Sequence, residues 1–81
     1  ERLGLRLKPM PGVGMVIGAV RPGSVSAQVG LRAGDVIRKL NNRSTSSLNE
    51  YREAVIQARA SRSVLLLVVR GQRGYYLTLP F

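Results

Sequence analysis

Residues 23–37 of the chain are Gly-Ser-Val-Ser-Ala-Gln-Val-Gly-Leu-Arg-Ala-Gly-Asp-Val-Ile. This stretch predicts one or two turns of helix, because Ser24 is a suitable N-cap and Gly30 lies where helices commonly end in a left-handed residue. A tight connection then leads into a strand over 36–41. Asp35 lies in that connection, and its side chain is expected to accept hydrogen bonds from local backbone amides. A catalytic role is disfavoured, because no second carboxylate or base lies near it.

The chain opens with a run of alternating character, Arg2-Leu3-Gly4-Leu5-Arg6-Leu7. This period of two predicts a half-buried strand that is entered through a glycine. Because glycine has no side chain over its own amide, a partner could approach the N–H groups of Leu3, Gly4 and Leu5 closely. A plain core strand is the alternative interpretation.

A helix is expected from Ser47 to about residue 60, because Ser47 and Glu50 form a capping box. Apolar residues recur through it at steps of three and four, which directs one face toward a core: Tyr51, Ala54, Val55 and Ala58. An adjoining stripe of the same helix carries Leu48, Arg52, Val55 and Arg59. Only a groove beside the helix would give its two arginines a role beyond that of solvated surface residues.

Turn residues and apolar runs define the remaining segments. They predict a loop over 8–12, a strand buried on both faces over 13–20, a turn at Asn41-Asn42, a long buried strand over 63–69, a hairpin turn over 70–74 and a returning strand over 75–79. The chain therefore has five to six strands, one short helix and one long helix, with no internal repeat.

The composition excludes several classes of function. Eighty-one residues with 44% hydrophobic content suit one small folded domain. The absence of cysteine excludes a thiolate nucleophile, and the absence of histidine removes the usual general base and the commonest metal ligand, so that four carboxylates are the only acidic groups left for catalysis. We therefore expect no catalytic site, no metal and no cofactor.

The longest apolar run, over 64–69, is far short of the roughly 20 residues needed to span a bilayer. With neither an initiating Met nor a signal-peptide pattern, the chain is expected to be a domain of a longer protein.

Thirteen basic residues give the chain a formal net charge of +9. They are spread along the whole sequence, with no basic run longer than two and few aromatic residues for base stacking. This distribution favours a solvated surface over a nucleic-acid site. It would also favour anionic partners, including the C-terminal carboxylate of a peptide.

The run from Gly30-Leu31 through Gly34-Asp35 to Ile37 resembles the signature of PDZ domains, and Asn41-Asn42 stands where many of them have Asn-Gly. The order of elements is similar to the bacterial, circularly permuted form, in which the ligand-binding strand comes first and a C-terminal strand is added. The chain looks like a PDZ domain of the Do-like (HtrA-type) serine proteases, more like their second, C-terminal copy. The resemblance implies a single PDZ domain over 1–81 with an α+β fold, a small partly open β-barrel or sandwich.

The resemblance also implies a peptide site. The family's carboxylate-binding loop matches Arg2, Leu3, Gly4 and Leu5, and the strand from Leu5 to Lys8 would pair with the peptide as an added strand. The groove would be completed by Arg6, Leu7, Leu48, Arg52 and Val55. Its apolar pocket would accept an aliphatic or aromatic last residue. Leu48 stands where the eukaryotic pattern has histidine, so selection for Ser or Thr two residues before the peptide end is not expected, and Arg52 would instead favour an acidic or polar residue.

The implied function is recognition of hydrophobic C-termini or extended, unfolded segments for a serine protease encoded elsewhere in the parent chain, in the bacterial periplasm or cell envelope. Other domains of the same protease oligomer are further expected partners. A scaffolding PDZ module of a secretion or envelope complex is the alternative, and a catalytic Gly-x-Ser-Gly segment upstream would distinguish the two. No nucleic acid is expected as a partner.

The end of the chain, Leu79-Pro80-Phe81, is hydrophobic, as the ligands of such a pocket would be. We therefore expect that it can dock in the groove of a neighbouring molecule. The alternative is a plain strand end. Phe81 packed into the fold of its own chain would count against docking.

Overall fold

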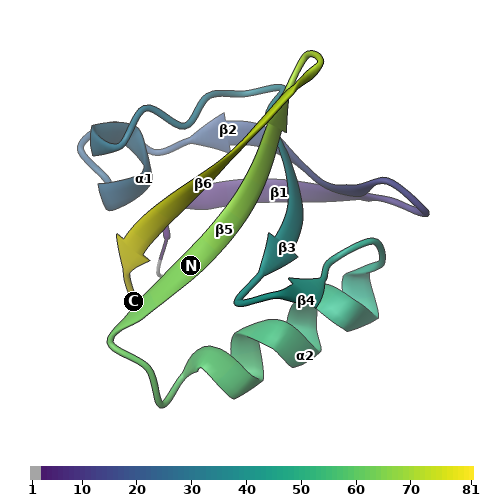
Figure 1. Ribbon diagram of the computed structural model, residues 1–81. Coiled ribbons are helices and arrows are strands. Elements are labelled where there is room, and N and C mark those ends of the chain that lie inside the picture. The colour runs from purple at the N-terminus through teal and green to yellow at the C-terminus, as the bar shows by residue number, and fades with distance from the viewer. Residues whose placement is uncertain (1–2) are drawn as a thin grey trace.

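The computed structural model describes residues 3–81. Figure 1 shows its helices and strands, which are β1 (Leu5–Met10), β2 (Gly14–Val20), α1 (Val25–Gln28), β3 (Val36–Leu40), β4 (Arg43–Ser44), α2 (Leu48–Ala58), β5 (Ser63–Arg70) and β6 (Arg73–Pro80). The expected α+β class, the short and the long helix and the upper count of six strands are confirmed.

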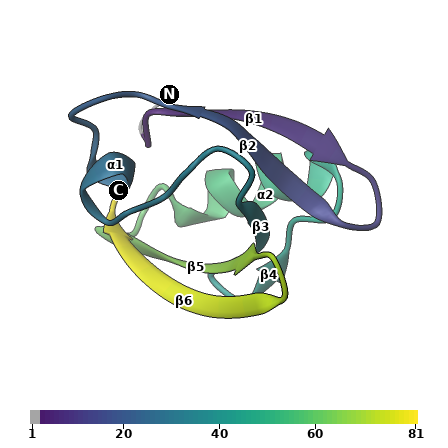
Figure 2. The same cartoon turned by 90° about the horizontal axis from the view of Figure 1, so that it is seen from above.

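All strand pairs are antiparallel, in the order β1-β2-β3-β5-β6, with β4 paired to β3. Within residues 3–81 the sheet is strongly curved but open, because its two edge strands, β1 and β6, do not pair with each other. Figure 2 shows β1 and β2 on one side of the molecule, β5 and β6 on the other, and α2 between them. The first strand of the chain is therefore an edge strand with α2 beside it.

The core lies between the curved sheet and α2. Its largest fully buried side chains come from four different strands and include Met15, Ile17, Ile37, Leu40, Leu66, Val68 and Leu79. Tyr51, Ala54 and Ala58 cover them from the buried face of α2, as the spacing of apolar residues predicted. Over residues 3–81, neither helix has the length and apolar character needed to cross a membrane.

Local sequence signals place both helices. At α1, the Ser24 side chain accepts a hydrogen bond from the Ala27 amide (3.2 Å), and Gly30 follows with φ of +91°. At α2, the Ser47 hydroxyl accepts from the Glu50 amide (3.1 Å). The Glu50 carboxylate reaches back to Ser46, whose amide and hydroxyl donate at 2.9 and 2.6 Å. The hydroxyl bond from Ser46 is the largest cause of a lowered pKa at Glu50.

The turn at Asn41-Asn42 is a two-residue hairpin between β3 and β4. Both residues have positive φ, 52° and 66°, as a type I′ turn requires. Asparagine tolerates this region better than other residues with a side chain. The Asn41 side chain also accepts a hydrogen bond from the Leu65 amide (2.8 Å), which fixes the turn against β5.

Two expectations about the first hairpin are wrong. The predicted loop over 8–12 begins later, because β1 continues through Pro9 to Met10 and only the residues after it turn. An edge strand tolerates proline, because the missing N–H leaves no ladder bond unmade when it faces the open side. The strand over 14–20 is not buried on both faces, since Gly18 and Ala19 are exposed.

Asp35 forms the predicted turn and an ion pair that the sequence did not indicate. Its carboxylate accepts from the Arg32 amide (3.0 Å) and, in a bidentate pair, from Arg70 at 2.7 and 2.8 Å. Arg70 also donates to the Gly30 carbonyl (2.8 Å). The hydrogen bond from Arg70 holds the pKa of Asp35 below its usual range. The pair joins the connection after α1 to the end of β5.

Candidate functional site

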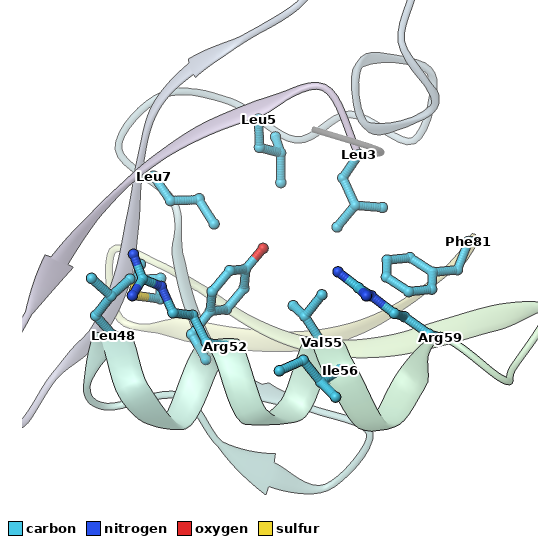
Figure 3. A pocket seen from close by; sticks show the side chains of 11 residues that line it. Leu3, Leu5, Leu7, Leu48, Arg52, Val55, Ile56, Arg59 and Phe81 are labelled. Carbon is cyan, nitrogen blue, oxygen red and sulfur yellow. The ribbon is translucent and has the colours of Figure 1, made fainter.

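A cavity of about 660 Å³ lies between β1 and α2. This volume is within the range of sites that bind small molecules. Its lining consists of Leu3, Leu5, Leu7, Met15, Leu48, Tyr51, Arg52, Val55, Ile56, Arg59 and Phe81. We call it the β1–α2 groove. Figure 3 shows the leucines of the N-terminal segment on one side and the α2 side chains facing them across it.

The loop that leads into β1 is held by its carbonyl groups. The Ser26 hydroxyl donates to the Leu3 carbonyl (2.7 Å), and the Arg21 amide donates to the Gly4 carbonyl (2.8 Å). By contrast, the amides of Leu3 and Gly4 donate to no acceptor within residues 3–81. The loop therefore combines a fixed backbone with N–H groups available to a partner.

Gly4 is required by this geometry for two reasons. Its φ of +71° is a conformation that residues with a side chain rarely adopt. A Cβ atom added there would also lie only 2.6 Å from the Ser24 Cβ atom at the start of α1. Glycine thus lets the loop pass directly over the helix N-terminus.

Leu5 directs its backbone polar groups toward the open edge of the sheet. It lies opposite Val20, and the bond from the Arg21 amide to the Gly4 carbonyl flanks this pair. In an antiparallel ladder, that pattern is typical of a non-hydrogen-bonded pair, whose members point their N–H and C=O groups away from each other. The N–H and C=O of Leu5 therefore point away from β2.

The backbone N–H and C=O of Leu7 also point away from β2, as a separate set of hydrogen bonds indicates. It lies opposite Ile17, whose amide donates to the Asp35 carbonyl (2.8 Å) and whose carbonyl accepts from the Gly34 amide (2.7 Å). Ile17 thus uses both backbone groups on its far side, so Leu7 receives no bond from it. Because α2 lies on the side of β1 away from β2 (Figure 1), the free groups of both leucines face the groove.

The α2 wall is apolar with two cations. Leu48, Val55 and Ile56 line it together with Arg52 and Arg59, and both arginines are exposed to solvent. No Asp or Glu of residues 3–81 lines the groove. Along it, Leu7 and Leu48 lie at one end, whereas Leu3, Arg59 and Phe81 lie at the other (Figure 3). An anionic ligand would therefore find positive charge along one wall.

Six of the nine predicted site residues lie together in the groove lining: Leu3, Leu5, Leu7, Leu48, Arg52 and Val55. Gly4 is not part of this lining, although its two neighbours are, and it lines a second hollow on the other side of the loop with Arg6 and Arg21. Arg2 lies outside the described residues. The structure does not bring Arg6 into the groove, because its side chain alternates with those of Leu5 and Leu7 and points to the opposite face of β1. There it lines this second, smaller hollow together with Arg21.

Five lining residues were not predicted as site residues: Met15, Tyr51, Ile56, Arg59 and Phe81. Arg59 could have been found, because it lies seven residues after Arg52 on the same helical stripe. Met15 and Phe81 carry no such signal, since only the curvature of the sheet brings their segments to this cavity. Tyr51 was predicted as a core residue, and it is one: it is buried and also reaches the groove.

The expectation that Leu79-Pro80-Phe81 docks in a neighbouring molecule does not fit the structure. Leu79 is fully buried within β6, and Phe81 packs against the core of its own chain. The Phe81 amide donates to the Arg62 carbonyl (2.9 Å). Docking elsewhere would require the end of β6 to leave the sheet, because β6 is paired with β5 as far as Pro80. Phe81 instead forms part of the groove in which it was expected to be a ligand.

Comparisons with known proteins identify the family of this chain. A family model described as a PDZ domain matches residues 16–70. A probable periplasmic serine endoprotease DegP-like from Pseudomonas putida is 40% identical over 65 residues, which cover 80% of this chain and 13% of that protein. A protein of the same description from Bartonella henselae is 35% identical over 83 residues, which cover 99% of this chain and 16% of that protein.

Among solved structures, the HtrA3 PDZ domain bound to a phage-derived ligand (FGRWV) has a TM-score of 0.81 and 25% identity. The match covers 96% of this chain and 82% of that one. The chain thus matches nearly a whole PDZ domain, although it spans less than a fifth of the length of the two curated relatives.

Proposed function

The chain belongs to the PDZ domain family, and we propose that its β1–α2 groove binds the C-terminal residues of a peptide as an additional strand on β1. PDZ domains are binding modules and not catalytic domains, so this chain is not an enzyme by itself. In strand addition, backbone hydrogen bonds supply affinity and alternate side-chain pockets supply selectivity. The HtrA3 PDZ domain was solved with a phage-derived ligand, which supports a peptide as the ligand here.

The observation that carries the proposal is the free backbone of β1. Leu5 and Leu7 present N–H and C=O groups toward the groove, and the amides of Leu3 and Gly4 in the preceding loop donate to no acceptor within residues 3–81. An unpaired strand edge is a template for another strand. We infer that the amides of Leu3, Gly4 and Leu5 hold the terminal carboxylate, while Leu5 and Leu7 pair with the peptide backbone.

The end of the groove near this loop suits an apolar last residue. Leu3 and Leu5 are buried, and Val55 and Phe81 are partly buried around the same cavity. Full burial of one aliphatic or aromatic side chain contributes about 1.5–3 kcal/mol. A short peptide that adds a few net hydrogen bonds should therefore bind in the micromolar range, at about −8 kcal/mol or less favourably.

We further propose that the domain comprises residues 1–81 and serves a serine protease of the bacterial periplasm, as a second PDZ copy that recognises substrates or contacts other domains of the oligomer. The support is the identity with two proteins described as periplasmic serine endoproteases. The sequence of the full-length protein tests this: a protease domain with a preceding PDZ copy would support it, and an open reading frame without protease residues would contradict it.

The carboxylate loop is tested by titrating a peptide that ends in Val with this domain, as a free acid and as a C-terminal amide. We expect the free acid to bind at least tenfold more tightly, because charge-assisted bonds to backbone amides are lost in the amide. Gly4→Ala should abolish this preference, since the added Cβ collides with Ser24. Equal affinity of the acid and the amide would overturn the proposal.

Gly12→Ala is the matched control. Gly12 also has a positive φ, +77°, but an added Cβ would meet nothing within 4 Å, and the residue lies away from the groove. This variant carries the backbone strain without the collision, so it should keep the preference for the free acid. A loss of preference in both variants would indicate general destabilisation, which thermal unfolding would detect.

A further inference from the structure

Pro9 lies in the strand to which the peptide would be added. β1 runs from Leu5 to Met10, and Pro9 pairs with Met15 of β2. The orientation of its backbone follows from the alternation along the strand. Because Leu5 and Leu7 direct their polar groups to the open edge, Pro9 is the next residue to do so.

A separate observation agrees with this orientation. The Met10 carbonyl accepts a hydrogen bond from the Val13 amide (2.9 Å), so it faces the turn into β2 and not the open edge. Its neighbour Pro9 must then face the opposite way. Its ring nitrogen carries no hydrogen, so the open edge of β1 offers donors at Leu5 and Leu7 but only an acceptor at Pro9.

We propose that Pro9 ends the row of donors on β1 and thereby limits how far the groove reads a peptide backbone. The inference rests on the proposed function. With the last residue of the peptide opposite Leu5, the third residue from the end lies opposite Leu7 and exchanges two backbone hydrogen bonds with it. The fifth residue from the end lies opposite Pro9. Its N–H can donate to the Pro9 carbonyl, but its own carbonyl finds no donor.

Pro9 is thus a specificity-determining residue, because it limits the number of peptide residues whose backbone pairs with β1. It allows tight backbone pairing for the last three residues and weakens pairing beyond them. Ligands of this domain should be selected by their extreme C-terminus, with little contribution from upstream sequence. The same proline would hinder the edge of β1 from pairing with a second copy of the sheet.

The test compares N-acetylated peptides of three and six residues that share the same last three residues, with alanine at the upstream positions. Each is titrated against the wild-type domain and Pro9→Ala, followed by amide chemical shifts. Pro9→Ala should bind the six-residue peptide about two- to tenfold more tightly than the wild type, the effect of one added hydrogen bond. The affinity for the three-residue peptide should stay the same.

Pro11→Ala is the matched control, because Pro11 lies in the turn after β1 and outside the ladder. It should leave both affinities unchanged. As a second measurement, the new amide at position 9 should become protected from hydrogen exchange when the six-residue peptide binds, but not when the three-residue peptide binds.

Failure of the proposed function and failure of the role of Pro9 would give different results. If the wild-type domain binds neither peptide, the proposed function is wrong. If it binds both, but folded Pro9→Ala shows neither the gain for the longer peptide nor the protected amide, only the role of Pro9 is wrong. Thermal unfolding of Pro9→Ala establishes that the variant is folded.

Discussion

At the scale of single residues, one carboxylate and its arginine connect segments that are distant in sequence. Asp35 is 2% exposed and is held by Arg70, which is 36% exposed. Exposed ion pairs contribute little, but a buried carboxylate that loses its partner is costly. The pair also fixes the connection whose Gly34 amide and Asp35 carbonyl bond to Ile17 opposite Leu7. A structural residue outside the groove thus supports the orientation of its wall.

Asp35→Asn should lower the free energy of unfolding by about 1.5–3 kcal/mol, because the charge-assisted bonds to Arg70 are lost. Since the folded-state pKa of Asp35 is lowered, its stabilisation is complete above the ordinary carboxyl pKa of about 4 and is lost as pH falls through the lower, folded-state value. Urea unfolding between about pH 7 and pH 2 checks this.

The variant should show a flatter stability profile below about pH 4 than the wild type. Glu53→Gln is the control, because Glu53 is an exposed residue of α2 and has no ion pair within residues 3–81. An unchanged pH profile in Asp35→Asn would show that the Arg70 pair does not stabilise the fold.

At the scale of elements, α2 supplies both core and groove from a single amphipathic pattern. Tyr51, Ala54 and Ala58 face the core, while Arg52 and Arg59 lie two turns apart on the groove stripe. Figure 3 places Arg59 at the same end as Leu3 and Phe81. It is therefore the cation of α2 nearest to the loop that we propose to hold the carboxylate.

Arg59→Gln should weaken binding of the free-acid peptide by about two- to fivefold at low salt, because it removes one solvent-exposed attraction. The loss should shrink as salt is raised, and the amidated peptide should be unaffected. Isothermal titration at two salt concentrations measures both effects. Arg43→Gln, in exposed β4 outside the groove, is the charge-matched control. Equal losses of affinity in both variants would mean that binding depends only on the net charge of the domain and not on the position of Arg59.

At the scale of the whole molecule, the net charge of +9 is distributed and not concentrated. Exposed cations occur on several separate elements, including Arg6 and Lys8 on β1, Arg38 and Lys39 on β3, Arg43 on β4, and Arg52 and Arg59 on α2. Such a surface accelerates encounter with anionic partners without forming one phosphate-binding stripe.

We therefore expect no specific binding of nucleic acid. A labelled 20-nucleotide DNA should bind weakly at low salt and with a Kd above about 100 μM at 150 mM salt, weaker than typical non-specific DNA binders. Fluorescence anisotropy over a salt series is the measurement. Micromolar binding at 150 mM salt with a steep salt dependence would instead indicate a nucleic-acid site.

The sequence by itself determined the features that depend on neighbouring residues. Ser24 and Ser47 cap the two helices, Asn41-Asn42 makes a turn with positive φ, and alternating leucines make β1. Each signal works over a few residues, because caps, turns and periodicity are properties of local backbone geometry. The same alternation places the Arg6 side chain on the face opposite Leu5 and Leu7, and not in the groove where it was expected.

Only the tertiary structure decided which segments meet. Proline at position 9 indicated a loop, but at the open edge of a sheet it costs no hydrogen bond, so β1 continues through it. Likewise, the partner of Asp35 is 35 residues away, and Phe81 reaches the groove only because β6 curves with the sheet. Register and curvature arise from the packing of all strands together, and no local pattern contains them.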